Sequence, residues 1–351
     1  MQRNQLDSLF NPESVAVIGA SEKKGSVGGA LMGNMVGAYT GKIYPVNPRH
    51  DKVMELDCVS SVDDLEKTPD LAVIATPART VAGIVDDCGR KGIRAAVIIS
   101  AGFGETGREG KEAEQQMDTK RREYGMRIVG PNCLGIMRPG LNLNLTFLRR
   151  IPDKGGVAFF SQSGAMGSAI LDWASAVNVG FSAFISVGNM LDVDFGDLID
   201  YFGNDRDTRS IIMYMESVTD AANFMSAARS FARTKPIVVI KAGKHARSAQ
   251  AVASHTGSLA GQDAVYEAAF RRVGVTRVEN VGDLFTCSEL LAKQPPPSGS
   301  RVCVITNAGG PGILTADALL DHGGRLAEIS RETREQLESI LPAHAGMDNP
   351  I

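Results

Sequence analysis

Ser14-Val-Ala-Val-Ile18 runs directly into Gly19-Ala-Ser-Glu-Lys-Lys-Gly25-Ser-Val-Gly28-Gly29, and a helical pattern follows from Ala30 to Tyr39. A short apolar strand, a glycine-rich loop and a helix form the opening unit of a doubly wound nucleotide-binding fold. Glycines allow a tight turn and close approach of the backbone, and the free N–H groups at the start of the helix attract phosphate. The stretch predicts a Rossmann-like domain whose loop binds a ligand through Gly19, Ala20, Ser21, Gly25, Ser26, Val27 and Gly28.

Strands and helices continue to alternate up to about residue 145. The pattern predicts strands at 42–46, 71–75, 95–99 and 127–129, with helices at 80–91 and 106–124. This alternation implies a parallel sheet with its ligand at the carboxyl ends of the strands. The candidate contacts at these strand ends are Asn47, Pro48, Arg49, Thr76, Pro77, Gly102, Phe103, Asn132 and Cys133.

The glycine loop does not favour a dinucleotide. Its glycine spacing is looser than GxGxxG, and the second strand ends in Val46-Asn47-Pro48-Arg49 instead of the acidic residue that binds ribose in NAD-dependent dehydrogenases. Arg49 can pair with phosphate in a fork geometry, so a ligand that bears phosphates fits. The structural alternatives are glycines that serve only the turn, and plain turn chemistry at Asn132 and Cys133.

A second alternation occupies residues 150–294 and predicts a flavodoxin-like domain with a parallel sheet. Strands are expected at 155–160, 181–185, 210–214 and 236–240, with helices at 195–202 and 221–232. Ser163 and Gly164 follow the first of these strands, and Ser163 is a suitable N-cap for the apolar helix that comes next.

Gln294-Pro-Pro-Pro-Ser-Gly-Ser300 reads as a linker. After it, residues 300–351 repeat the pattern with a strand at 301–306, a small-residue loop and helices at 313–320 and 331–341. We expect this region to be the start of another flavodoxin-like domain, truncated before its end. Its loop contains the candidate anion-binding residues Asn307, Gly309 and Gly310.

Ser254-His255-Thr256-Gly257 places one imidazole among small residues. A neutral imidazole is a nucleophile near pH 7, because its unperturbed pKa is about 6.5. Glu216 follows the strand at 210–214, and a carboxylate there can hold one ring nitrogen and leave the other free to attack. The alternatives are a histidine that only caps or packs in a loop, and a glutamate that is a surface charge or a helix cap.

The composition is that of an ordinary globular protein. The chain has 351 residues, 43% hydrophobic and 22% charged, with a net charge of -3, which favours neither a nucleic-acid nor a membrane partner. Five dispersed cysteines without a CxxC pair, and no apolar run of about 20 residues, are typical of a cytoplasmic protein with reduced thiols. Asp194, Asp197, Asp200 and Asp205 are expected on a solvated acidic helix and loop, so no metal site is predicted.

In chain order, Gly130-Pro-Asn-Cys133, Ser161-Gln-Ser-Gly164, Glu216, Ser254-His-Thr-Gly257 and Asn307-Ala-Gly-Gly310 resemble the NDP-forming acyl-CoA synthetases. These are the ADP-forming acetate–CoA ligases, relatives of succinyl-CoA synthetase, and the resemblance covers essentially the whole chain. It implies an acid–thiol ligase that converts acyl-CoA, ADP and phosphate reversibly into a carboxylic acid, CoA and ATP. The intermediates it implies are an acyl phosphate and a phosphohistidine.

The resemblance also implies roles for particular residues. CoA would bind the first domain, and His255, oriented by Glu216, would carry the phosphoryl group. Two helix N-termini, at Ser163-Gly164 and at Gly309-Gly310, would hold the phosphate, with Gly257 and Asn307 beside them. Arg49 stands where the family often has a lysine.

The family's ATP-grasp portion, which binds ADP or ATP with Mg, is absent from these 351 residues. The resemblance therefore implies an ATP-grasp β subunit or downstream domain as a partner, and an oligomeric enzyme. Two other functions are considered: the CoA-binding part of a GNAT-fused protein acetyltransferase, and a non-enzymatic CoA sensor. Retention of His255 and Glu216 favours the synthetase, while the residues identify neither the acyl group nor the choice between ADP and GDP.

Overall fold

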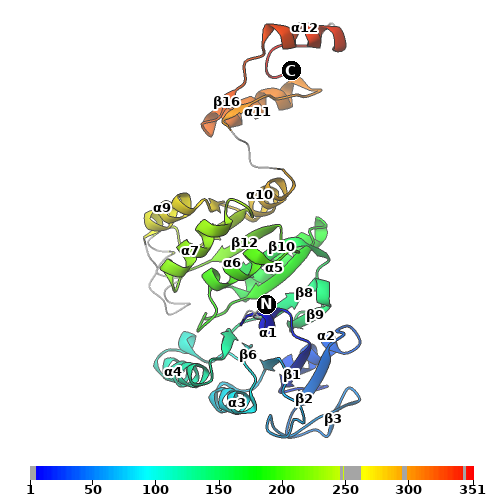
Figure 1. The fold of residues 1–351 in the computed structure, drawn as a ribbon, viewed down its shortest axis with the longest axis vertical. Coiled ribbons are helices and arrows are strands. Elements are labelled where there is room, and N and C mark those ends of the chain that lie inside the picture. The colour runs from blue at the N-terminus through cyan, green and yellow to red at the C-terminus, as the bar shows by residue number, and fades with distance from the viewer. Residues whose placement is uncertain (1–4, 246–247, 249–261, 295–298, 343–344) are drawn as a thin grey trace. The chain divides into compact units, whose positions relative to one another are not determined.

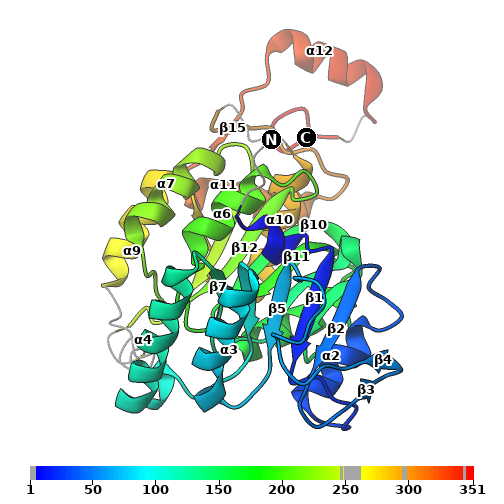
Figure 2. The same ribbon diagram turned by 60° about the horizontal axis from the view of Figure 1, so that its bottom comes forward.

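The computed structural model describes residues 5–245, 248, 262–294, 299–342 and 345–351. The chain divides into two compact units, Met1–Lys293 and Gln294–Ile351. Both units are built from strands and helices in alternation (Figures 1 and 2). Among the described residues, no helix has the length and apolar character that a membrane span requires.

The first sheet of the larger unit has five parallel strands in the order β2-β1-β5-β6-β7. Side chains alternate between its faces, so Val15 and Val17 join one core and Ala16 and Ile18 another. Helices α1 and α2 pack on the first face and α3 and α4 on the second, as Figure 2 shows for α3 and α4. The strands are β1 Ser14–Ile18, β2 Lys42–Val46, β5 Leu71–Ile74, β6 Ala95–Ile98 and β7 Arg127–Val129. The helices are α1 Asp7–Phe10, α2 Val27–Met35, α3 Ala78–Lys91 and α4 Arg108–Glu123, with a short turn η1 at Gly104–Thr106.

The second sheet has seven strands in the order β14-β13-β12-β10-β11-β8-β9. Helices α5 and α10 cover one face, and α6, α7 and α9 cover the other. The parallel strands are β10 Lys154–Ser161, β11 Phe181–Ser186, β12 Ser210–Met215, β13 Ile237–Lys241 and β14 Thr276–Arg277. The helices are α5 Gly164–Ala176, α6 Phe195–Asn204, α7 Ala221–Phe231, α9 Asp263–Val273 and α10 Val281–Lys293.

Two strands that the sequence analysis did not predict complete this second sheet. β8 (Gly135–Arg138) pairs antiparallel with β11, and β9 (Leu143–Thr146) pairs antiparallel with β8. The turn η2 (Pro139–Leu141) joins them. Residues 135–146 thus belong to the second sheet, whereas the sequence analysis placed most of them in the first domain.

Three further pieces are small. β3 (Lys52–Val53) and β4 (Leu56–Asp57) form an antiparallel pair after β2. In the C-terminal unit, β15 (Arg301–Val302) pairs in parallel with β16 (Arg325–Leu326). The strand predicted at 301–306 is therefore shorter than expected, and α11 (Gly309–Asp321) begins earlier than the helix predicted at 313–320. The last helix is α12, Arg331–Ile340.

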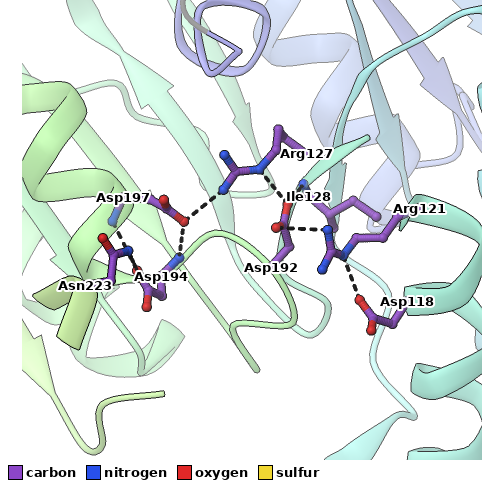
Figure 3. A network of polar contacts seen from close by, with 8 residues as sticks. All are labelled: Asp118, Arg121, Arg127, Ile128, Asp192, Asp194, Asp197 and Asn223. Carbon is purple, nitrogen blue, oxygen red and sulfur yellow. Dashed lines mark hydrogen bonds and ion pairs between the residues drawn. The ribbon is translucent and has the colours of Figure 1, made fainter. Parts of the chain in front are cut away.

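A network of charged groups connects the first sheet with the loop between β11 and α6 (Figure 3). Arg127 in β7 donates to Asp192 at 3.0 Å and to Asp197 at 2.8 Å, and Arg121 in α4 pairs with Asp192 at 3.1 Å. Asp194 caps α6 by accepting from the Asp197 N–H at 3.0 Å. The solvated face expected for Asp194 and Asp197 is wrong, because Asp194 is only 5% exposed and Asp197 binds Arg127.

We expect Arg127→Met to lower the free energy of unfolding by about 3 kcal/mol, measured by urea denaturation. The substitution leaves the carboxylate of Asp192, whose side chain is 9% exposed, with one cation fewer in partly desolvated surroundings. Arg122→Met is the control, because Arg122 is 69% exposed and an exposed ion pair contributes at most about 1 kcal/mol. Equal losses in the two variants would contradict a structural role for the network.

Candidate functional site

The glycine loop brings the end of β1 against the start of α2. A Cβ on Gly28 would lie 1.9 Å from the Gly19 carbonyl oxygen, so only glycine fits there. Gly19 has a φ of +92°, a conformation that glycine adopts without strain. Ser26 caps α2 by accepting from the Gly29 N–H at 3.1 Å. The loop therefore directs the free N–H groups of α2 over the carboxyl end of the first sheet.

Three adjoining cavities surround this loop. The loop cavity, of about 560 Å³, includes Lys23, Lys24, Gly25, Ser26, Val27 and Arg149 in its lining. The arginine cavity, of about 520 Å³, includes Gly19, Asn47, Pro48, Arg49, Thr76, Pro77 and Arg79. The central cavity, of about 700 Å³, includes Val27, Thr76, Ser100, Asn132, Cys133, Gln162, Ser163 and Gly164. Val27 is shared by the loop and central cavities, and Thr76 by the arginine and central cavities, so the three are neighbours.

The central cavity joins predicted residues from both sheets. Asn132 and Cys133 follow β7, and Ser163 and Gly164 stand at the start of α5. Ser163 is the N-cap of α5 and accepts from the Met166 N–H at 3.3 Å. The positive end of α5 thus lies at the cavity, where it favours an anion.

Five predicted contacts do not line these cavities. Ala20 is fully buried, and Ser21 accepts a hydrogen bond from the Lys23 N–H at 3.0 Å. Gly28 packs on Gly19. Phe103 belongs to the core, and the N–H groups of Gly102 and Phe103 donate to Glu105 at 2.6 and 3.1 Å. These five residues shape the loops behind the cavities.

Cys133 is a cavity residue but not a nucleophile. Its thiol donates to the Ile98 carbonyl at 3.2 Å, and burial raises its pKa to about 12. At neutral pH the sulfur is therefore a protonated thiol, and the thiolate is the reactive form. Cys133 thus contributes to the shape of the cavity.

Glu216 follows β12 and is 7% exposed. The Gln162 carboxamide fastens this turn, because its oxygen accepts from the N–H groups of Glu216 at 2.5 Å and Ser217 at 2.9 Å. Its nitrogen donates to the Ser217 hydroxyl at 3.1 Å. Gln162 also lines the central cavity, so it connects Glu216 to that cavity.

His255 and Gly257 lie outside the described residues. The described strand and helix nearest to them in sequence carry charged groups: Lys241 ends β13 and Asp263 begins α9. Lys241 is 6% exposed, with its ammonium donating to the Ala242 carbonyl and lying 4.3 Å from the Tyr266 ring centre. Burial lowers the pKa of Lys241, although Asp263 opposes this effect. In the C-terminal unit, Gly309 and Gly310 begin α11 as expected, and Asn307 is exposed just before it.

Sequence reasoning missed Gln162, Arg79 and Lys241. Gln162 stands inside the quoted stretch Ser161-Gln-Ser-Gly164, and Arg79 lies in the first turn of α3 beside Pro77. A basic residue at a strand's carboxyl end was the available signal for Arg79. Gln162 and Lys241 gave no local signal. Gln162 binds the turn at Glu216, and Lys241 lies over the Tyr266 ring, so the partners of both are remote in sequence.

Two protein-family models match the chain. Residues 13–139 match a family model described as a CoA binding domain, and residues 154–291 match one described as a succinyl-CoA ligase like flavodoxin domain. The α subunit of ADP-forming acetate–CoA ligase II from Pyrococcus furiosus is 43% identical over 346 residues, covering 99% of this chain and 75% of the relative. The ADP-forming acetate–CoA ligase of Methanocaldococcus jannaschii is 43% identical over 347 residues, covering 99% of this chain and 49% of the relative.

A solved structure agrees with these matches. The dinucleotide-forming acetyl-coenzyme A synthetase 1 of Ca. Korarchaeum cryptofilum, in complex with phosphate and ADP, has a TM-score of 0.92 and 39% identity. The match covers 99% of this chain and 75% of that one. This chain belongs to the family of ADP-forming acetate–CoA ligases, and the resemblance and α/β fold expected from the sequence are confirmed. It spans about three quarters of the separate α subunits and about half of the relatives from Methanocaldococcus jannaschii and Archaeoglobus fulgidus.

Proposed function

We propose that this chain supplies the CoA-binding and phosphoryl-carrying parts of an ADP-forming acyl-CoA ligase. The supporting observation is the central cavity, which brings Asn132 and Cys133 together with Ser163 and Gly164. A thioester held there has its carbonyl beside the positive end of α5, which stabilises the oxyanion and phosphate of an acyl transfer. The domains expected from the sequence are CoA-binding at 1–145, ligase at 150–294 and the start of a second ligase domain at 300–351. We propose the same three with the first ending before Gly135, because β8 and β9 belong to the second sheet.

CoA is a long anion, and the two outer cavities supply cations for it. Arg49 and Arg79 line the arginine cavity, and Lys23, Lys24 and Arg149 line the loop cavity. Guanidinium groups bind phosphate through paired hydrogen bonds, so the arginine cavity suits the phosphoadenosine end. The pantetheine arm then passes Thr76 into the central cavity, which adjoins at that residue.

The proposed reaction has two transfers on this chain. An oxygen of inorganic phosphate attacks the thioester carbonyl, the C–S bond breaks, and CoA leaves as a thiolate that takes a proton. A nitrogen of His255 then attacks phosphorus in the acyl phosphate, the bond from phosphorus to the acyl oxygen breaks, and the carboxylate leaves. Glu216 holds the other ring nitrogen and stabilises the charged ring.

The phosphoryl group must next reach ADP. We assign the nucleotide, with Mg, to an ATP-grasp subunit or domain that assembles with this chain into an oligomer. A helix N-terminus stabilises an anion by about 0.3–2 kcal/mol. The start of α5 is one proposed phosphate-binding group, and the start of α11, Asn307 and Gly257 are others, each proposed for its own part of the chain. A small carboxylic acid is the proposed product.

The direct test is labelling by acetyl phosphate that carries ³²P. We expect the protein to acquire an acid-labile, alkali-stable label, the signature of phosphohistidine. CoA binding is measured in parallel by calorimetry. A protein that binds CoA but acquires no such label would contradict the phosphoryl-carrying role, and failure to bind CoA would contradict the proposal as a whole.

We expect Glu216→Gln to slow this labelling about 10- to 100-fold, since a neutral amide stabilises the imidazolium less than a carboxylate. CoA affinity should not change, because the substitution keeps the hydrogen bond that the backbone N–H of residue 216 donates to the Gln162 side-chain oxygen. Glu289→Gln on the exposed surface of α10 is the matched control. An unchanged labelling rate would remove Glu216 from the mechanism.

A further inference from the structure

A chain of side-chain amides and carboxylates lies behind the central cavity. The Asn189 nitrogen donates to Glu105 Oε2 at 2.7 Å and to Glu114 Oε1 at 3.2 Å. The Asn132 nitrogen in turn donates to the Asn189 oxygen at 3.2 Å. The members come from η1, α4, the loop after β7 and the loop after β11, so distant segments converge on Asn132.

The Glu105 carboxylate determines which way each amide faces. An ionised carboxylate only accepts hydrogen bonds, so the Asn189 nitrogen must face Glu105 and its oxygen must face Asn132. Burial raises the pKa of Glu105, but hydrogen bonds from Asn189 and Gly102 outweigh it and hold this pKa below its usual value. Glu105 is therefore ionised at neutral pH. The Asn132 side-chain nitrogen must then face the Asn189 oxygen, so the Asn132 side-chain oxygen faces away from Asn189.

The backbone holds Asn132 in the same place. Its N–H donates to the Ser100 carbonyl at 2.9 Å, and its φ of +56° belongs to the left-handed region, which asparagine tolerates better than most residues. The Asn189 N–H donates to the Pro131 carbonyl at 3.0 Å, which fixes the second amide beside the first. Asn132 lines the central cavity, and in the described structure no hydrogen bond is made to its side-chain oxygen.

We propose that Glu105 and Asn189 are positioning residues that orient the Asn132 carboxamide, so that its oxygen accepts a hydrogen bond from an N–H or S–H group of the ligand in the central cavity. This inference rests on the proposed function, in which that ligand is the pantetheine arm of CoA. The arm offers amide N–H groups as donors in both acyl-CoA and CoA, and a terminal thiol as a donor in free CoA. Asn132 thus recognises the arm, while the arginines recognise the phosphates.

Replacing both carboxylates by amides tests the orientation. In Glu105→Gln/Glu114→Gln, the new carboxamide oxygen at position 105 can still accept from the N–H groups of Gly102 and Phe103, which turns its NH₂ toward Asn189. Asn189 then reverses, Asn132 follows, and an NH₂ group replaces the accepting oxygen in the cavity. We expect the Kd for CoA to rise about 3- to 10-fold, the loss of one hydrogen bond.

A ligand without the arm separates recognition from general damage. The probe is 3′-phosphoadenosine 5′-diphosphate, which keeps the phosphates of CoA and lacks pantetheine, and its Kd should not change. Glu112→Gln/Glu123→Gln, on the exposed surface of α4, is the control with the same change in net charge, and we expect it to leave the ratio of the two Kd values unchanged.

Asn132→Gly removes the amide without straining the left-handed backbone. We expect Asn132→Gly to raise the Kd for CoA by a similar factor. The triple variant Glu105→Gln/Glu114→Gln/Asn132→Gly should have a Kd for CoA no higher than that of Asn132→Gly alone. Unchanged CoA affinity in the double glutamine variant, equal weakening of both ligands, or additive effects in the triple variant would each overturn the inference. If the wild-type protein binds neither ligand, the proposed function fails instead.

Discussion

Substituting alanine for His255 is expected to abolish phosphoryl labelling by acetyl phosphate, because the variant has no imidazole nitrogen to attack phosphorus. Attack by water is the remaining route, and it leaves no label on the protein. The affinity for CoA should not change, because the proposed contacts with its phosphates come from the arginines and lysines that line the arginine and loop cavities. The measurement is acid-labile ³²P incorporation together with CoA calorimetry.

His322→Ala is the matched control for this experiment. His322 is exposed at the end of α11, where its ring contacts the Ala318 carbonyl at 2.9 Å, and its loss should leave labelling at the wild-type rate. Wild-type labelling in His255→Ala would show that another residue carries the phosphoryl group. The phosphohistidine assignment would then be wrong, whereas the CoA-binding assignment would stand.

The second large effect is expected for Gly28→Ala. The new methyl group would lie 1.9 Å from the Gly19 carbonyl oxygen, a backbone atom that cannot move without displacing β1 or α2. We expect a loss of about 3 kcal/mol in the free energy of unfolding, the upper end for overpacking, and at least a 10-fold rise in the Kd for CoA. Urea denaturation and calorimetry measure the two quantities.

Gly33→Ala on the same helix provides the comparison. The nearest atom to its new Cβ is the Met54 methyl carbon at 3.8 Å, and alanine favours a helix over glycine by roughly 0.5–1 kcal/mol. This variant should be as stable as the wild type or more so, with CoA affinity retained. If Gly28→Ala also keeps wild-type stability and CoA affinity, the close approach of α2 to β1 is not what holds the loop in its binding conformation.

The parts of the fold that sequence reasoning predicted are those with local patterns. β1, β5 and β6 are buried on both faces of a parallel sheet, so each appears as a short apolar run beside a turn. β8 and β9 were not predicted, because they join the second sheet only through the pairing of β8 with β11, nearly fifty residues further along the chain. α10 was also not predicted, although the side chains of Leu284 and Phe285 are buried in the core.

The site divides in the same way. The glycine loop and the Ser163 cap depend on neighbours within a few residues, so a single stretch of sequence predicts them. Gln162 meets Glu216 across 54 positions, and Asn189 meets Glu105 across 84. The first contact forms when β10 and β12 pair within the second sheet, and the second forms when the two sheets come together, so no local pattern encodes either.

The crossing of β8 and β9 into the second sheet has a consequence for recombinant fragments of this enzyme. A fragment that begins at Lys154, where the ligase module starts by family comparison, lacks both strands. The backbone of Phe184 and Ile185 would then present an open hydrogen-bonding edge, the kind of surface through which chains aggregate. Gene fusions and domain exchanges should therefore place their junction before Gly135, so that both strands travel with the ligase half.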